Sequence, residues 1–378
     1  MRIPVRRLVR LAVGIALGVV TLEVTARVDD WIRFGADPVA YYGPKNLVTT
    51  DERGLTCNRP NVRYEKWRHD GRGYRVYPGT ARNSNGSLCI CVGSSESYGL
   101  YEKPGGEWPA LLSYLLAPDG VDVENASVVG ISPFELPWYL EQHVLPEKPD
   151  RVLLIISPFS FMYGMELSGT APDSAHFADP ARLERMRVAR APALREQSRF
   201  LPKAQRSILR RLPPDWTRRL AIATKERKLA KLQRAGKRPA TLLDAPPPQA
   251  LVAYVDLLEH LQRRLARRGV QMGICTYPNS LSDEPTLAER DAVLDRTLWL
   301  PAFSPAGLRA IADSFAAATR AYCDSTGVVL VDFEAAIPHD TEDFADSVHL
   351  TDTGARRAAE VAAGTLRGLT ATVARDGR

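Results

Sequence analysis

The sequence predicts a three-layer α/β fold of the flavodoxin-like kind, with helices on both faces of a five-stranded parallel sheet. Short apolar runs of strand length alternate with segments of helical periodicity through residues 85–378. The run at 152–156 has no charged residue, which is typical of a strand that a parallel sheet buries on both faces. With 378 residues, 45% of them hydrophobic and 25% charged, the chain suits one sizeable core with a long insertion.

The expected elements follow in the order strand, helix, strand, helix, strand, insertion, helix, strand, helix, strand, loop, helix. Pro109 suits the first turn of a helix, and the leucines after it recur at helical spacing. Arg267 and Arg268 place positive charge in the last turn of a later helix, and Gly269 follows them as a usual helix end. We expect strands at 88–92, 121–126, 151–156, 270–278 and 328–333, and helices at 107–116, 137–144, 249–268, 308–323 and 355–366.

Residues 1–26 predict a segment that engages a membrane. Four arginines come before residue 11, and residues 11–22 carry no charge. This pattern is typical of an uncleaved signal anchor with a cytoplasmic N-terminus, or of a cleaved signal peptide. An anchor would cross the cytoplasmic (inner) membrane once through residues 5–26. Cleavage after the small residues near position 26 would instead leave a secreted or periplasmic protein, and either alternative places the remainder outside the cytoplasm.

Residues 27–84 are expected to form a linker and an N-terminal flap, because turn-forming residues recur in them. Within this flap, residues 70–76 suit a short edge hairpin that packs on the core. The rest of the chain, 85–378, is expected to form the α/β domain.

Residues 161–247 interrupt the alternation of strands and helices and predict a helical insertion. Between residues 195 and 238 there are fifteen Lys or Arg and three acidic residues, with apolar residues interleaved. Such basic amphipathic helices either face solvent as a lid or contact anionic lipid or an acidic glycan. Nucleic acid is not an expected partner, because an exported chain rarely meets it and the sequence has no motif for it.

The candidate site begins where the first core strand ends. Residues 88–92 are apolar and run directly into the sequence Gly-Ser-Ser-Glu-Ser-Tyr-Gly at 93–99. A serine there lies at the edge where open α/β sheets hold their sites, beside a helix N-terminus with unpaired N–H groups. Ser95 is therefore the candidate nucleophile. Ser94 and Ser97 are candidate neighbours that cap the helix or face the oxyanion.

A candidate base lies near the other end of the chain, where Asp346 and His349 are three residues apart. An imidazole can take the proton of a serine hydroxyl, and a carboxylate can hold the required tautomer. Together with residues 93–99, this segment resembles the first and last blocks of the SGNH (GDSL-like) hydrolases, Gly-Asp-Ser-x-Thr-x-Gly and Asp-x-x-His. The sequence Gly-Tyr-Arg at 73–75 resembles a stretch that precedes the first block in membrane-anchored bacterial members.

Two intermediate blocks extend the resemblance. Residues 125–130 resemble the second block, which implies an oxyanion hole formed by the backbone N–H groups of Gly130 and Ser95. Pro-Asp-Arg-Val at 149–152 resembles the strand that leads to the third block, Gly-x-Asn-Asp. There the chain departs from the family: Phe159 takes the place of the Asn and cannot donate a hydrogen bond, and Ser160 takes the place of the Asp. Losing one oxyanion donor typically slows such a reaction roughly 100- to 1000-fold.

The resemblance implies a serine esterase or O-acyltransferase that forms an acyl-enzyme on Ser95 and uses no cofactor. The expected compartment and the basic insertion favour an O-acetylated envelope or extracellular polysaccharide as substrate. Because the Asn is absent, an inactive, membrane-tethered binding or assembly protein stays open as the alternative. The five cysteines show no metal-binding spacing with histidine, and nothing selects a disulfide pairing among them.

Overall fold

The computed structural model describes residues 5–39, 47–77, 86–168, 198–209, 213–281 and 286–376, and its central sheet confirms the expected fold class. Five parallel strands lie in the order β6-β5-β7-β8-β9. Counted along the core this is 2-1-3-4-5, the flavodoxin-like order. The strands are β5 (Ser87–Val92), β6 (Val121–Asn125), β7 (Arg151–Ile155), β8 (Gln271–Cys275) and β9 (Val329–Val331).

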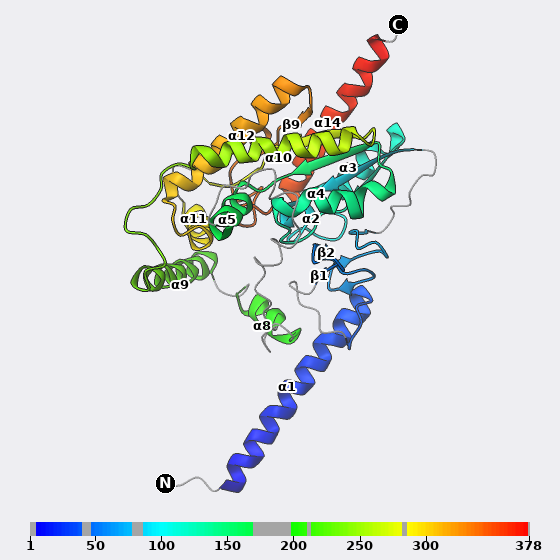
Figure 1. The fold of residues 1–378 in the computed structure, drawn as a ribbon. Helices are drawn as coiled ribbons and strands as arrows, with labels where there is room; N and C mark the ends of the chain where they lie inside the picture. Colours follow the sequence, from blue (N-terminus) through cyan, green and yellow to red (C-terminus); the bar gives the residue numbers. More distant parts are fainter. Residues whose placement is uncertain are drawn as a thin grey trace.

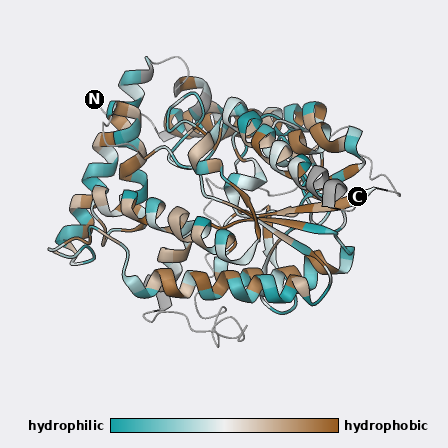
Figure 2. Cartoon of the chain, turned by 90° about the horizontal axis from the view of Figure 1, so that it is seen from above, coloured by the Kyte–Doolittle hydropathy of each residue, from teal (hydrophilic) through white to brown (hydrophobic). Residues whose placement is uncertain are grey.

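Helices cover both faces of this sheet. The right-handed connections between parallel strands place α3 and α14 on one face, where they pack on each other, and α4, α10 and α12 on the other (Figure 1). Figure 2 shows hydrophobic strands enclosed between helices whose outward sides are hydrophilic. The core helices are α3 (Trp108–Leu116), α4 (Leu136–Tyr139), α10 (Pro248–Ala266), α12 (Pro305–Thr326) and α14 (Asp352–Asp376). All five cysteines are buried free thiols.

Several helix boundaries differ from those expected. The helix expected at 137–144 is α4 followed by a wider, π-helical turn, η4 (Leu140–Val144). The helix α12 begins earlier than expected because the Ser304 hydroxyl accepts the N–H of Gly307 and Pro305 takes the first helical position. Short helical segments complete the described core: α2 (Ser95–Tyr98), η2 (Ala117–Asp119), η3 (Pro133–Glu135), η5 (Leu145–Glu147) and α13 (Phe333–Ala336).

Neither of two helices near the carboxyl edge of the sheet is among the elements expected from the sequence. The helix α5 (Pro158–Ser168) follows β7 directly, and α11 (Leu287–Trp299) precedes α12. The start of α11 carries a capping box, in which Thr286 and Glu289 bond to each other's backbone N–H groups. Both helices lie beside the candidate site, where α11 carries Arg296 and α5 carries Phe159.

The N-terminal segment forms one long helix, α1 (Val5–Phe34), which projects away from the body of the protein (Figure 1). Its stretch from Arg6 to Phe34 is long and apolar enough to cross a membrane, with mean hydropathy 1.9 in its most apolar window, and none of that window is buried. No other helix in the described ranges meets this criterion. The helix continues without a break through the candidate cleavage site near residue 26.

The helix α8 (Phe200–Leu209), from the insertion, packs against α1. The Glu23 carboxylate accepts the backbone N–H groups of Arg199 and Phe200, and therefore satisfies donors at the start of α8. Lys203 forms ion pairs with Asp29 at 2.8 Å and with the buried Asp30 at 2.6 Å. The acidic residues that follow the apolar part of α1 therefore bind residues of the insertion.

A second insertion helix, α9 (Pro214–Arg234), packs on α11. Lys225 reaches Asp291 at 2.7 Å and Asp295 at 2.6 Å, and Glu226 pairs with Arg290 at 2.5 Å. Part of the positive charge in the insertion is therefore used to hold α9 against the core.

The flap consists of two small antiparallel hairpins and the loop that follows them. The hairpins are formed by β1 (Val48–Thr50) with β2 (Thr56–Asn58), and by β3 (Arg63–Tyr64) with β4 (Trp67–Arg68). The backbone N–H of Arg75 donates to the carbonyl of Asn125, which attaches the loop to the edge of β6. This agrees with the edge-packing expected for residues 70–76.

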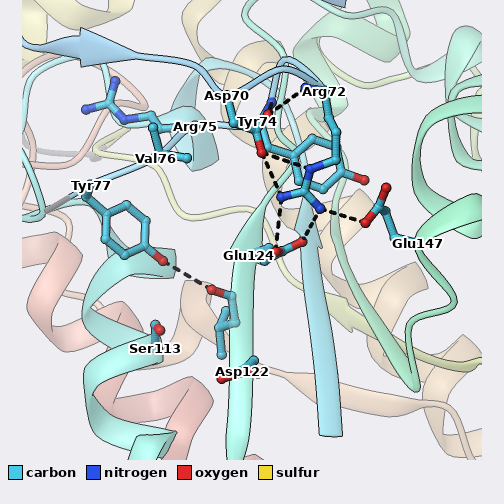
Figure 3. Close-up of a pocket in the computed structure, with 11 residues that line it drawn as sticks. Asp70, Arg72, Tyr74, Arg75, Val76, Tyr77, Ser113, Asp122, Glu124 and Glu147 are labelled. Atoms are coloured by element: carbon cyan, nitrogen blue, oxygen red, sulfur yellow. Dashed lines mark hydrogen bonds and ion pairs between the residues drawn. The ribbon is translucent and has the colours of Figure 1, made fainter. Parts of the chain in front are cut away.

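A cavity of about 490 Å³ lies between this loop and β6 (Figure 3). The guanidinium of Arg72 binds Asp70, Glu124 at 2.9 Å and Glu147 at 2.7 Å. One cation therefore bridges carboxylates from the flap, from the edge strand and from η5. This arrangement ties the flap to the sheet and does not bring a nucleophile next to a base.

Candidate active site

Three side chains meet at the carboxyl edge of the sheet. Nε2 of His349 lies 2.8 Å from Oγ of Ser95, and Nδ1 of the same ring lies 2.7 Å from Oδ2 of Asp346. With the Nδ1–H donated to the carboxylate, the free Nε2 is the acceptor for the serine hydroxyl. The arrangement satisfies the geometry of a nucleophile, a base and a group that orients the base.

Ser95 reaches this position because β5 is followed by a residue, Gly93, at which only glycine fits. A Cβ at Gly93 would lie 2.3 Å from Cγ2 of Ile155 and 2.8 Å from Cβ of Ser97. The absence of a side chain lets the end of β5 pass closely against β7 before the chain turns into α2. Ser95 is the first residue of α2, so its hydroxyl lies at the sheet edge.

Hydrogen bonds within the loop that precedes α14 hold the candidate base in place. Oδ1 of Asp346 accepts the backbone N–H groups of Val348 and His349, each at 3.0 Å. Burial alone would raise the pKa of Asp346, but the hydrogen bonds and charge of His349 and the two backbone donors outweigh it and lower that pKa well below its ordinary value. Asp346 therefore stays ionised and fixes the imidazole.

A backbone N–H from the second block also lies at the site. The N–H of Gly130 donates to Oγ of Ser94 across 3.3 Å, and Gly130 has a φ of +74°. The long distance marks a weak hydrogen bond, so this N–H can turn to a stronger acceptor. The N–H groups of Gly130 and Ser95 are the candidate oxyanion donors.

The other expected neighbours occupy different environments. Ser94 is the N-cap residue of α2, although its side chain forms no capping hydrogen bond, and Ser97 is fully buried in the same helix. Phe159 is also fully buried, with its ring centroid 6.0 Å from that of Tyr277. The N–H of Ser160 donates to Oγ of Ser157, so the divergent third block is the start of α5.

Sequence reasoning missed three residues beside the triad. The Tyr101 ring, which is partly exposed, lies 5.2 Å from the His349 ring. Glu96, next to the candidate nucleophile, is buried, and this burial raises its pKa. Nε of Arg296 donates to Oγ of Ser347 at 2.8 Å. The capping box at the start of α11 was the available signal for this helix, on which Arg296 lies.

Among the residues that the structure describes, no group of His, Cys, Asp or Glu is arranged to hold a metal ion.

The strand order and the placement of Ser95, Asp346 and His349 at one edge define an SGNH-like α/β fold. No protein-family model matches the chain, and neither does any curated protein. Among solved structures, it is similar to an acetylxylan esterase from Geobacillus stearothermophilus, with 14% identity and a TM-score of 0.40 over 75% of this chain and 96% of that one. A lipase/acylhydrolase from Enterococcus faecalis gives 11% identity and a TM-score of 0.40 over 75% of this chain and 96% of that one. Because these identities and scores are low, the function proposed below is based on the geometry of the site.

Proposed function

We propose that the protein is a serine esterase or O-acyltransferase in which Ser95 is the nucleophile, His349 the base and Asp346 the group that orients the base. The observation that carries this proposal is the continuous hydrogen-bonded chain from Oγ of Ser95 through His349 to Asp346.

The reaction follows from this chain of contacts. His349 takes the hydroxyl proton as Oγ of Ser95 attacks the ester carbonyl, and the carbonyl electrons move to its oxygen. The N–H groups of Ser95 and Gly130 stabilise that oxyanion. When the tetrahedral intermediate collapses, His349 returns the proton to the leaving alcohol, and an acyl-Ser95 ester remains. Water or an acceptor hydroxyl, deprotonated by His349, then attacks the ester and regenerates Ser95.

Fluorophosphonate labelling tests the nucleophile directly, because the reagent phosphonylates an activated serine. We expect the wild-type protein to be labelled and Ser95→Ala to be inert. The control is Ser325→Ala, which changes an exposed serine at the far end of α12 and should label normally. A folded wild-type protein that resists labelling and hydrolyses no ester would support the alternative, an inactive SGNH-like binding or assembly protein tethered to a membrane.

For the substrate we propose an O-acetylated envelope or extracellular polysaccharide. The basic insertion at 195–238 and the location at a membrane that α1 indicates support this choice. Acetate release from acetylated polysaccharides, measured beside hydrolysis of p-nitrophenyl acetate, tests this choice. Cleavage of the small ester with no acetate release from any glycan would remove the polysaccharide while leaving the esterase.

For the location we propose a single-pass protein of the cytoplasmic membrane with the α/β domain outside the cytoplasm. The length and apolarity of α1 and the arginines before it support this orientation. We expect the protein to stay with membranes after alkaline extraction and to be digested by protease added to spheroplasts. A mature N-terminus near residue 27 would instead show a cleaved signal peptide and a secreted or periplasmic protein.

We further propose that the insertion at 195–238 contacts anionic lipid or an acidic glycan. Lys203 and Lys225 are used in internal ion pairs, but other cations on α9 are exposed. Replacing the exposed Arg227, Lys228, Lys231 and Arg234 with Gln should weaken binding to anionic vesicles or to an acidic polysaccharide, whichever the wild type binds. The exposed Arg267, directly after α10, supplies the control variant Arg267→Gln, which should bind as the wild type does.

A further inference from the structure

An arginine beside the triad has donors that the protein does not use. Arg296 is half-buried on α11, and its Nε–H is donated to Oγ of Ser347. Within the described ranges, its two terminal nitrogens form no ion pair and no further hydrogen bond. By contrast, Arg290 on the same helix is paired with Glu226 at 2.5 Å. A planar guanidinium held at one nitrogen presents a fixed pair of donors to a ligand.

Aromatic rings from two helices surround this guanidinium. Its carbon lies 5.5 Å from the ring centroid of Phe159 on α5 and 5.2 Å from that of Trp299 on α11. The Trp299 ring in turn lies 5.4 Å from the ring of Tyr163 on α5. Trp299 is 47% exposed and Tyr163 is 40% exposed, so the cluster combines a held cation with accessible aromatic surface.

The cluster adjoins the catalytic residues. Ser347, which holds Arg296, directly follows Asp346 in the loop that carries His349. The positive charge of Arg296 attracts the carboxyl group of Glu96, which is next to Ser95 in the chain. Burial nevertheless raises the pKa of Glu96 and favours its neutral form, so Glu96 does not fully satisfy the arginine.

We propose that Arg296, Trp299 and Tyr163 form a subsite for a carboxylate-bearing sugar ring of the ester substrate. The guanidinium binds the sugar carboxylate through two parallel N–H donors, and the exposed rings contact the C–H face of the sugar. The substrate class is then an acyl ester of an acidic glycan. This inference extends the proposed esterase function at the same site, since it assigns the part of the substrate that lies beside the acyl group.

Kinetics on paired substrates test the subsite. The substrates are acetylated oligosaccharides of a uronic acid, acetylated xylooligosaccharides, which are neutral, and p-nitrophenyl acetate. We expect Arg296→Gln to lower kcat/KM for the acidic oligosaccharide roughly 10- to 100-fold, mainly through KM, because it removes a hydrogen-bonded charge. The other two substrates should change less than about threefold. Arg290→Gln, on the same helix, should behave as the wild type does.

Two outcomes would overturn the subsite. An equal loss on all three substrates would mean that Arg296 acts only by holding the loop of Asp346 through Ser347. A wild-type enzyme that does not prefer the acidic oligosaccharide over the neutral one would exclude carboxylate recognition.

Binding measurements separate this proposal from the esterase itself. Ser95→Ala should bind a deacetylated uronic acid oligosaccharide by calorimetry at least tenfold more tightly than a xylooligosaccharide, and Ser95→Ala/Arg296→Gln should lose that difference. If the wild type hydrolyses no ester but the binding difference is found, the esterase fails and the subsite stands. If esters are hydrolysed but the binding difference is absent, the reverse holds.

Discussion

The imidazole Nε2 of His349 lies 2.8 Å from the hydroxyl of Ser95, although 254 positions separate the two residues in the sequence. The contact follows from the topology, because β5 and β9 are parallel strands of one sheet and the segments that follow them begin at the same carboxyl edge. A parallel sheet gathers its strand ends there, so residues at opposite ends of a long chain can meet. The insertion between β7 and β8 leaves the order of the five strands intact.

The first prediction concerns Asp346, whose carboxylate accepts Nδ1–H of His349. In Asp346→Asn the amide can donate to Nδ1, which favours the wrong imidazole tautomer and leaves Nε2 protonated. We expect kcat for p-nitrophenyl acetate to fall on the order of 10⁴-fold with little change in the midpoint of thermal unfolding. Asp119→Asn, which alters a surface ion pair with Arg367 at 2.8 Å, is the control and should retain activity. A loss of less than tenfold in Asp346→Asn would contradict the assigned role.

The second prediction compares two glycines with nearly the same backbone. Gly130 has a φ of +74° and Gly120 a φ of +70°, and a Cβ at either position would meet nothing within 4 Å. Alanine should therefore strain both positions alike, at a cost of about 1 kcal/mol in the free energy of unfolding.

Only Gly130→Ala should reduce kcat, by at least tenfold, because strain there moves an oxyanion N–H, whereas Gly120 lies in the turn before β6. Urea unfolding and steady-state kinetics of the two variants check this. Equal activities in the pair would remove Gly130 from the oxyanion hole.

The core could be predicted from the sequence because its signals are local. Each expected core strand appears within a few residues of its predicted bounds, since uncharged runs such as 152–156 have few alternatives to a central strand. The family resemblance also predicts, from the sequence alone, that Ser95 and His349 lie together as nucleophile and base. Whether they catalyse stays a prediction for the labelling experiment.

The surroundings of the triad could not be predicted in the same way. Arg296 reaches the site through the packing of α11 beside the loop of Ser347, and this contact joins segments 51 residues apart. The family resemblance places Phe159 where other members have Asn, whereas the position of its ring is set by burial against Tyr277 at the start of α5. Such contacts depend on how helices pack in the folded protein, and no local sequence pattern reports that packing. The capping box of Thr286 and Glu289 could have revealed α11, but not its neighbours.

The third prediction concerns the stability of the flap against acid. His69 is buried, its Nδ1–H is donated to the carbonyl of Arg59, and its Nε2 accepts the hydroxyl of Tyr98 on α2. Burial, with a smaller contribution from the charge of Arg75, lowers the pKa of His69 from 6.5 to about 4. The folded protein therefore holds this ring neutral.

Because the folded pKa is depressed, the stabilising contribution of His69 is complete above pH 6.5 and is lost as the pH falls towards 4. The loss amounts to about 3 kcal/mol in the free energy of unfolding. Urea unfolding of wild type and His69→Gln between pH 7.5 and 4.5 isolates this contribution, since all other titrating groups are shared. Parallel pH dependences of the two proteins would show that His69 does not titrate on unfolding.

The last prediction concerns the buried ion pair between Arg75 of the flap and Glu107, which precedes α3. The two groups are 2.8 Å apart, and each side chain is 1% exposed. Nη1 of Arg75 and Oε2 of Glu107 have no hydrogen-bond partner in the described part of the chain, so the pair is desolvated without full compensation. Removing one member leaves a buried charge, whereas removing both leaves none. We therefore expect Arg75→Met and Glu107→Gln each to lower the free energy of unfolding by about 3–5 kcal/mol.

The double variant Arg75→Met/Glu107→Gln should lose much less than the sum of the two, and the coupling measured in the cycle should exceed about 2 kcal/mol. The guanidinium carbon of Arg75 also lies 4.9 Å from the ring of Tyr98, on the same short helix as Ser95. The single variants should thus slow fluorophosphonate labelling of Ser95 even under conditions where they stay folded, and the double variant should restore part of the rate. Additive losses in stability would show that the two charges are solvated in solution, and the flap would then not be tied to the nucleophile helix through this pair.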